Sequence, residues 1–342
     1  MRHFNLTSRW LLVMLFVFAS QYAYGDFGEF SNVATDLGFR AEDHSKLLAG
    51  DIITADLPET TDKMLAQAFA VFAPIHTHKV ADLALSEHVF AADANVIASG
   101  RIDPDKIAES LTKAAFTSAE ANEAKQLKNF SGGEAFNLST EEIAKIKKAV
   151  TSGKTSTKAL SKVYRAILAG RMEAYLKSGI QGIAPFDRGN GINTRAANDF
   201  DAMTKASTIL AKDLPGLYRT FLEYPNNQSA YIEHAFFWVK RRVENRPTFI
   251  LEHRILERSP ASMILLRREF FVGHSYNGTQ AISGAFTISQ QGTLIFTTIR
   301  TSSDQVAGLM GGAQSLGRKM LRDEVTKRFK NLREHFVAEH KR

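Results

Sequence analysis

The sequence predicts an α+β protein in which a curved antiparallel β-meander packs on a long C-terminal helix. Two observations carry this prediction. Five segments rich in β-branched and aromatic residues follow one another between residues 234 and 301, and an amphipathic helical pattern then runs to the C-terminus. The connections between these segments are too short to hold crossover helices, so neighbouring strands must be antiparallel. We therefore place the meander and the terminal helix in residues 231–342.

Turn residues separate the five predicted strands. The strands span residues 234–243, 249–257, 263–273, 279–289 and 293–301. Pro247 and Pro260 follow the first two strands, where a strand must stop or turn. Asn277 and Gly278 predict a tight hairpin before the fourth strand, because both residues tolerate positive φ angles.

A cap and an apolar stripe predict the C-terminal helix. Ser302, Ser303 and Asp304 are N-cap candidates, because their side-chain oxygens accept hydrogen bonds from the first helical N–H groups. Apolar residues then recur at helical steps: Val306, Leu309, Ala313, Leu316, Met320, Val325, Phe329, Leu332 and Phe336. Such a stripe predicts that one face of the helix is buried against the sheet.

The chain before the meander divides into two regions. Strands are predicted at residues 50–55, 66–73 and 95–102, with a helix at 76–91 that follows Pro74. Further helices are predicted at 107–115, 118–127, 140–150, 157–177 and 196–212. Residues 26–103 are thus the opening strands and helix of the α+β domain, and residues 104–230 are a mostly helical region. The alternative is two separate domains, a mostly helical one followed by a sheet-plus-helix one.

This order of elements resembles the helix-grip fold of START and Bet v 1-like lipid-binding domains. The junction Ala73-Pro74 and the His-Lys-Val-Ala-Asp-Leu segment at 78–83 look like the strand-to-helix entry of that superfamily. The helical residues 104–230 stand between this opening and the meander, where the superfamily has far fewer residues. The resemblance therefore implies a helix-grip-like domain with a large helical insertion.

Residues 47–336 more closely resemble a family of exported bacterial proteins with no assigned activity. Three segments carry this resemblance: Phe-Ser-Gly-Gly-Glu-Ala-Phe-Asn-Leu-Ser at 130–139, Gly-His-Ser-Tyr-Asn at 273–277 and Leu-Met-Gly-Gly-Ala at 309–313. Relatives often have cysteines around the first segment, and this chain has none. The resemblance implies export and architecture but no reaction.

The first 25 residues have the pattern of a signal peptide. Arg2 and Arg9 form a basic start, residues 11–18 are apolar, and Ala23-Tyr24-Gly25 is a small-x-small cleavage site. We expect cleavage after Gly25 and export to a bacterial periplasm. The absence of cysteine excludes disulfides and lipidation at a lipobox, so the mature protein is expected to be stable on its core alone.

Charge is distributed unevenly along the chain. Residues 26–150 carry 12 Lys and Arg against 20 Asp and Glu, whereas residues 151–342 carry 29 against 16. This asymmetry lets the two halves attract each other, or gives the C-terminal half an affinity for anionic partners. Nucleic acid is not expected as the partner of an exported protein, which leaves an anionic membrane surface or another envelope protein. An unevenly charged, solvated surface is the structural alternative.

No motif of an enzyme, a metal site or a cofactor site is evident in the sequence. His76, His78 and His88 are interpreted as structural or surface residues, because no cysteine or paired carboxylate accompanies them. General acid–base candidates lie on or beside the meander: Glu233, His234, His253, Arg254, Glu269 and His274. Cross-strand ion pairs are the favoured interpretation of these residues. No Gly-x-Ser-x-Gly motif and no P-loop occurs, so we expect a binding protein rather than an enzyme.

The first functional hypothesis is a carrier or binder of an apolar or amphipathic ligand such as a lipid. A strongly curved sheet closed by one helix tends to leave an apolar cavity. The aromatic residues of the meander predicted to line it are Phe236, Trp238, Phe249, Phe270, Phe286 and Phe296. The second hypothesis is an envelope adaptor that docks on a membrane or protein through Arg318, Arg322 and Arg333 of the last helix. A hydrolase acting on an envelope component is a third.

Overall fold

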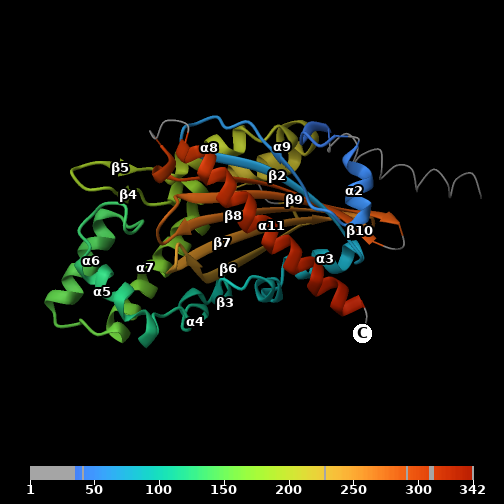
Figure 1. Cartoon of the computed structure of the whole chain (residues 1–342). Coiled ribbons are helices and arrows are strands. Elements are labelled where there is room, and N and C mark those ends of the chain that lie inside the picture. Colours follow the sequence, from blue (N-terminus) through green and yellow to red (C-terminus); the bar gives the residue numbers. More distant parts are fainter. Residues whose placement is uncertain (1–34, 41, 227–228, 290–291, 308–311, 341–342) are drawn as a thin grey trace, which may run out of the picture.

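The protein is built around one eight-stranded sheet with helices on both faces (Figure 1). The computed structural model describes residues 35–340 except 41, 227–228, 290–291 and 308–311, so the predicted signal peptide lies outside the described residues. The strand order is β1-β2-β10-β9-β8-β7-β6-β3, and each neighbouring pair is antiparallel. The predicted α+β class, with a large antiparallel sheet and a C-terminal helix, is confirmed.

Ten strands occur in the described residues. They are β1 (Ile53–Asp56), β2 (Met64–Ala73), β3 (Val96–Ile102), β4 (Phe186–Asp187), β5 (Asn193–Thr194), β6 (Ile232–Val243), β7 (Arg246–Arg258), β8 (Ser262–Val272), β9 (Gly278–Ser289) and β10 (Gly292–Ser302). β4 and β5 form a separate two-stranded ribbon. The five predicted meander strands correspond to β6 through β10, each within a few residues of its predicted bounds.

The tight turn of the meander is not where the sequence predicted it. Glu244 and Asn245 form the two-residue connection between β6 and β7, with φ angles of 49° and 62°. The hairpin prediction for Asn277-Gly278 is wrong, because residues 273–277 form a longer loop in which Ser275 has a φ of 74°. The side chain of Asn277 instead binds groups from other parts of the chain.

The helices before the meander are more numerous than predicted, although those predicted at residues 140–150 and 157–177 are each only one residue longer. They are α2 (Asp43–Ala49), α3 (Thr77–Ala84), α4 (Ile107–Ser110), α5 (Ala121–Asn129), α6 (Thr140–Thr151), α7 (Thr157–Ser178), α8 (Ala196–Lys205), α9 (Thr208–Asp213) and α10 (Pro215–Glu223), with 3₁₀ turns η1 (Glu87–Ala92), η2 (Ser118–Glu120) and η3 (Gly179–Gly182). The predicted helix 76–91 divides because Ser86 accepts a hydrogen bond from the amide of His88 and starts η1. None of the described helices is long and apolar enough to cross a bilayer.

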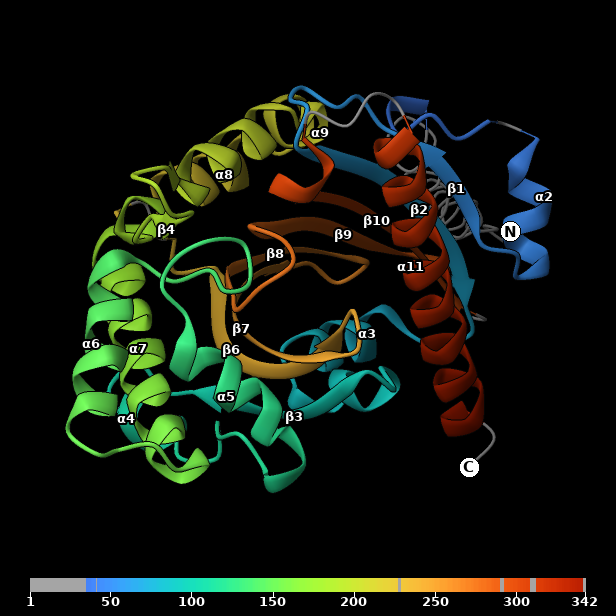
Figure 2. The ribbon, with the colours of Figure 1, turned by 60° about the vertical axis from the view of Figure 1, so that its left-hand side comes forward.

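The two faces of the sheet pack against different layers. Figure 2 shows α11 (Gly312–His340) across the open, concave side of the sheet, with α3 beneath it, and α4 to α8 around the outside. Side chains alternate between these layers along each strand. On β6, Phe237 and Val239 pack with Phe90 of η1, whereas Phe236 and Trp238 pack with the helices of residues 104–230.

The terminal helix begins later than predicted, and its apolar stripe is only partly buried. Ser302 ends β10, and Ser303 caps a short 3₁₀ turn, η4 (Asp304–Val306). Val325 and Phe329 are buried on the sheet, as the stripe predicted. Leu316 and Met320 are more than half exposed, so that part of the prediction is wrong. Other predicted stripe positions were Leu309, which lies outside the described residues, and Ala313 and Phe336, whose side chains are not described.

A polar cluster ties the two-stranded ribbon to the end of the sheet. The carboxylate of Asp304 accepts hydrogen bonds from Lys63 Nζ at 2.6 Å, Arg188 Nε at 2.9 Å, Thr194 Oγ1 at 2.8 Å and Asn277 Nδ2 at 3.2 Å. Burial acts to raise the pKa of Asp304, but these partners outweigh it and lower the pKa to about 2. The carboxylate therefore holds together groups that are far apart in the sequence.

Segments 130–139 and 273–277, on which the predicted resemblance to exported proteins was based, meet at this cluster. Arg188 Nη2 donates to Oδ1 of Asn137 at 2.9 Å and to Oδ1 of Asn277 at 3.0 Å. Asn137 Nδ2 donates in turn to the carbonyl oxygens of Val272 and Tyr276, both at 2.8 Å. These segments thus fix the loop after β8 against the helical layer, which is a structural role.

Substitution of Asp304 by Asn should lower the free energy of unfolding by roughly 2–3 kcal/mol at neutral pH, because the charged acceptor of several hydrogen bonds is lost. The folded-state pKa lies below the unfolded-state value. The stabilising contribution is therefore present above pH of about 4 and lost as the pH falls toward 2. Urea unfolding measured from pH 7 downward checks both statements. Asp323→Asn, on the exposed surface of α11, is the matched control, and an equal effect of the two variants would contradict the assignment.

Candidate functional site

A cavity of about 210 Å³ lies between the concave face of the sheet and the elements that cover it. Its covering wall comes from α3, η1 and α11, through Val80, Leu83, Ala84, Val89, Phe90, Val325, Phe329 and Leu332. Its floor comes from β8, β9 and β10, through Met263, Leu265, Ala281, Ser283, Ile295, Thr297 and Ile299. Most of this surface is apolar.

Small residues on β9 leave the space for this cavity. Ala281, Ser283 and Ala285 alternate along the strand and therefore share its concave face. Larger residues at Ala281 or Ser283, which line the cavity, would fill the volume beneath α11. The hydroxyls of Ser283 and Thr297, which line the floor, form a hydrogen bond of 2.8 Å across β9 and β10.

Charged side chains form one end of the cavity. Those that line it are Asp93, Arg241, Arg254, Arg267 and Arg328. Asp93 follows η1, and Arg328 belongs to α11. Arg241, Arg254 and Arg267 come from the neighbouring strands β6, β7 and β8. The cavity therefore has an apolar body and a largely cationic end.

Two glutamates pair with these arginines beneath the cavity. Glu252 and Glu269 lie opposite each other in the register of β7 and β8, and both are buried. Like charges in this position repel, so arginines must neutralise them. Arg254 Nε donates to Glu252 at 2.5 Å, and Arg267 Nη1 lies 3.3 Å from Glu252 and 3.0 Å from Glu269. Tyr276 Oη also donates to Glu269, at 2.7 Å.

The ion pairs continue from the sheet to α11. Burial acts to raise the pKa of Glu269, but Arg267 and Arg241 outweigh it and leave that pKa below its usual value. Arg241 Nε lies 3.3 Å from Asp93 Oδ2, and Arg328 Nε lies 3.2 Å from the same oxygen. These last two contacts are ion pairs without hydrogen-bond alignment. Asp93 is thus the link between the buried charges and the terminal helix.

The aromatic residues predicted to line the ligand cavity lie on the other face of the sheet. Phe236, Trp238, Phe249 and Phe270 pack in the core shared with the helices of residues 104–230, and Phe286 and Phe296 stack on each other beside α9. Alternate residues of a strand point to opposite faces of the sheet, and in the meander both sets are apolar. Composition alone therefore did not reveal which set faces α11. A bulge between β7 and β8 at Leu251/Glu252 also changes the phase, which puts both Phe270 and Phe271 under the helices.

The three arginines predicted to form a free docking face are engaged within the protein. Arg318 forms two hydrogen bonds to Glu59, at 2.7 and 2.9 Å. Arg322 Nη2 donates to Asp56 at 2.7 Å, and the guanidinium of Arg333 lies against Gly50. Two of the three charges are therefore compensated by carboxylates of the protein itself, and a docking role for these side chains stays a prediction. They hold α11 against the β1–β2 edge of the sheet.

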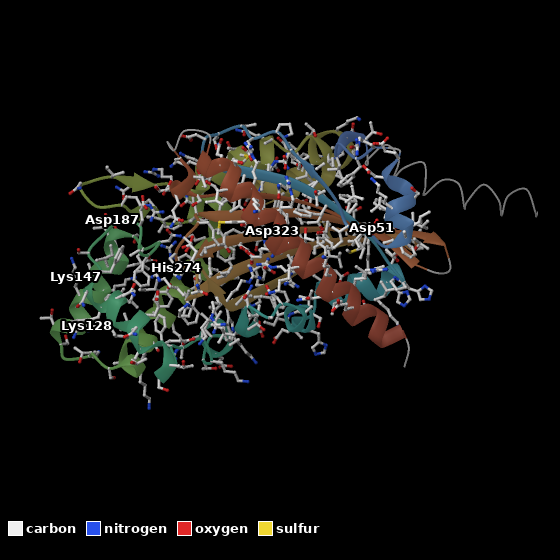
Figure 3. All side chains as sticks on the ribbon, viewed as in Figure 1. Asp51, Lys128, Lys147, Asp187, His274 and Asp323 are labelled. Carbon is white, nitrogen blue, oxygen red and sulfur yellow. The ribbon has the colours of Figure 1, made fainter. Side chains whose placement is uncertain are left out.

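The predicted acid–base residues do not converge on one point. Glu233 pairs with Arg258 at 2.5 Å on the surface, and Arg254 and Glu269 belong to the concave face. His274 is buried near the helical layer and bonds to Thr248 and Ser275, and burial lowers its pKa to about 3 (Figure 3). His234 and His253 do meet, on the face covered by the helices.

The histidines before the meander form no metal centre. His76 caps the start of α3, and its ring stacks on that of His78 at a centroid distance of 5.6 Å. Across the described residues, no group of three or more His, Asp or Glu side chains is arranged to hold a metal ion.

Comparisons with known proteins identify no family and include a weak structural neighbour. No protein-family model matches the chain, and no curated protein sequence matches it. The crystal structure of Ara h 8.0201, a Bet v 1-like protein, aligns with a TM-score of 0.21 and 13% identity over 40% of this chain and 88% of that chain. A likeness at this TM-score is too slight to support an argument. The resemblance to exported proteins has no support from a family model.

Substitution of Arg328 by Gln should loosen α11 without unfolding the sheet. The variant removes the arginine that joins the helix to Asp93, and the partial exposure of Arg328 limits the loss of stability to about 1 kcal/mol or less. Hydrogen exchange should accelerate in α11, with little change in β7 and β8. Lys327→Gln, at the adjacent exposed position, is the control. Unchanged exchange in α11 would show that Asp93 does not hold the helix.

Proposed function

We propose that the protein binds a small amphipathic anion in the cavity beneath α11. The observation that carries this proposal is the cavity's division into an apolar body and an end formed by Arg241, Arg254, Arg267 and Arg328. These four arginines outnumber by one the carboxylates beside them, the buried Glu252 and Glu269 and the partly buried Asp93. The exposed Glu324 also pairs with Arg328. An apolar chain would replace water along the body, and an anionic group would accept hydrogen bonds at the arginine end.

The volume of the cavity limits the size of the ligand. About 210 Å³ exceeds the roughly 150 Å³ of an engineered apolar cavity that holds benzene, but lies below the range of roughly 300–1,000 Å³ typical of drug-sized ligands. A short or medium-length acyl chain therefore fits better than a diacyl lipid. A longer ligand would require α11 to move outward.

The arrangement of the sheet and α11 supports such movement. In the described residues, α11 contacts chiefly β2 and η1, at opposite sides of the concave face, and spans the cavity between them. The order of β2, α3, β3, meander and α11 supports the helix-grip-like arrangement that the sequence resemblance implied. We propose that the helix acts as the cover of the ligand site and that residues 104–230 are an insertion on the opposite face.

Octanoate is expected to bind more tightly than octylamine, because the charged end of the cavity favours an anion. Isothermal titration calorimetry on the full chain, at one ionic strength, measures this difference. Native mass spectrometry after gentle purification tests in parallel for a co-purifying amphipathic anion. Equal or tighter binding of octylamine would contradict the anionic assignment, and binding of neither compound would overturn the cavity as the site.

Ala281→Leu tests whether octanoate binds in the cavity beneath α11, because the larger side chain would occupy the cavity floor. It should weaken octanoate binding at least tenfold. Ala285→Leu is the matched control, because Ala285 lies on the same strand and face but does not line the cavity. Each substitution is expected to cost about 1–3 kcal/mol of stability through overpacking. Similar octanoate affinities for the two variants would place the ligand elsewhere.

We also propose that residues 1–25 direct export and that the protein acts in the periplasm. The basic start, apolar run and Ala-Tyr-Gly site support this proposal. The mature chain recovered from the periplasm of an expressing bacterium should begin at Asp26, as N-terminal sequencing would show. Intact protein confined to the cytoplasm would contradict it.

Docking on an anionic membrane or an envelope protein is the alternative proposal. The net positive charge of residues 151–342 supports it. Engagement of Arg318 and Arg322 by carboxylates of the β1–β2 edge weakens it, because these charges are already compensated within the protein.

A further inference from the structure

A second pocket lies on the opposite side of the sheet from the cavity beneath α11. It is an open cleft of about 860 Å³ between the end of α7, the loop after β3 and the start of β6. Leu176, Tyr224, His234 and Phe236 form part of its wall. The cleft therefore combines aromatic and apolar surface with one imidazole.

His234 is the first member of a chain of hydrogen bonds that leads into the core. Its Nδ1 lies 2.9 Å from Nε2 of His253, and Nδ1 of His253 lies 3.0 Å from the hydroxyl of Tyr175. Arg268 Nη1 donates to the same hydroxyl at 3.3 Å. His253, Tyr175 and Arg268 are fully buried, so bulk water does not interrupt this chain.

The direction of each hydrogen bond follows from the guanidinium at the inner end. A guanidinium only donates, so the oxygen of Tyr175 accepts from Arg268. The buried hydroxyl has one other partner in the described residues, Nδ1 of His253, and directs its own hydrogen there. His253 then carries its proton on Nε2 and donates to Nδ1 of His234. His234 must therefore carry its proton on Nε2. This chain of hydrogen bonds therefore makes Nε2 of His234 a hydrogen-bond donor.

That donor has no partner within the described part of the chain. Nε2 of His234 is buried and makes no hydrogen bond, whereas the other nitrogen of the ring is satisfied. An unsatisfied buried donor costs about 1–3 kcal/mol. Burial also lowers the pKa of His234, so the ring is neutral at neutral pH. A ligand oxygen that displaces the atoms covering Nε2 and accepts from it would remove this cost.

Arg268 provides an independent reason to expect an anion. Its donors reach Gln280 Oε1 at 2.9 Å, the carbonyl oxygen of Phe221 at 2.9 Å and Tyr175, all of which are neutral. No described carboxylate forms an ion pair with it, although the side chain is completely buried. Its positive charge polarises the chain of hydrogen bonds that ends at His234, so that the donor at the cleft favours a negatively charged acceptor. Asp103 and Asp105 at the cleft rim are exposed, so solvent screens their repulsion of an anion.

Packing keeps rigid the chain of hydrogen bonds from His234 through His253 and Tyr175 to Arg268, which we call the relay. The ring of Phe236 stacks on His253 at a centroid distance of 4.3 Å, and Tyr224 lies 4.5 Å from the same ring. Gly179, with a φ of 56°, lies directly against the carbonyl of Tyr224 and leaves no room for a Cβ there. The end of α7 therefore holds Tyr224 in place as the aromatic wall of the cleft.

We propose that this cleft binds a small carboxylate with an aromatic or apolar body, whose oxygen accepts a hydrogen bond from Nε2 of His234. Tyr175, His253 and Arg268 are positioning residues that fix the donor. The site is separate from the cavity beneath α11, since the two lie on opposite faces of the sheet.

The test uses benzoate as the probe and the side-chain nitrogen resonances of ¹⁵N-histidine-labelled full-length protein as the readout. The free protein should show His234 protonated at Nε2 and bare at Nδ1. Benzoate should shift these resonances with saturation, and benzyl alcohol, a neutral acceptor of similar shape, should bind at least tenfold more weakly. A His234 protonated at Nδ1, no saturable shift with benzoate, or equal binding of benzyl alcohol would overturn the proposal.

Two variants separate the donor from the shape of the pocket. His234→Phe keeps a ring but removes the donor, and should weaken benzoate binding about tenfold, whereas His234→Gln keeps a donor and should bind more tightly than His234→Phe. Tyr175→Phe removes the link that fixes the tautomer and should also weaken binding, which keeps the test valid if a variant at His234 fails to fold. His88→Phe, at an exposed position of η1, is the control. Full benzoate affinity in both His234→Phe and Tyr175→Phe would show that the relay plays no part.

Discussion

Both faces of the inner strands of the eight-stranded sheet are buried, and the rest of the structure depends on this constraint. A strand covered on one side can alternate apolar and polar residues, but one covered on both sides must bury every residue. β7 illustrates the result, since its residues from Thr248 to Leu256 are all buried. Two separate layers are therefore needed. The helices of residues 104–230 supply one, and α3, η1 and α11 supply the other.

Polar groups in such a sheet must be paired by groups from distant parts of the chain. Arg254 shows how this is achieved: it donates to Glu252 on its own strand and to the carbonyl of Ala84 at the end of α3, and it lies over the ring of Phe90. Lys240, on the opposite face, donates to the carbonyl of Ala115 and to Glu120. Each buried charge thus joins the sheet to one covering layer. The charges contribute specificity as well as stability, because removal of one partner would leave the other uncompensated.

The sequence revealed the strands more fully than the faces they present. Pattern and turn residues were enough for the meander and the terminal helix, because strand and helix periods are local properties. The assignment of Phe236 and Trp238 to the cavity failed because Phe237 and Val239, in the other phase, are equally apolar. The alternating charges at Glu252 and Arg254, and at Arg267 and Glu269, were the available signal for the charged end of the cavity. Their convergence with Asp93 and Arg328 depends on tertiary packing, which spacing along the chain does not encode.

The two candidate sites lie back to back at the same level of the sheet, and alternation explains why. Glu252 and Arg254 point to the concave face, and His253 between them points to the helical face. Arg267 and Arg268 divide in the same way on β8. This central part of the sheet therefore holds several buried guanidinium groups within one or two residues of each other. Their combined field favours an ionised Glu269 on the concave face. It also favours a neutral imidazole at His253, whose pKa is lowered well below its usual value by burial, by His234 and by Arg268. It also favours an anion at either surface, so the two proposed ligands share a sign of charge for one physical reason, although they enter from opposite sides.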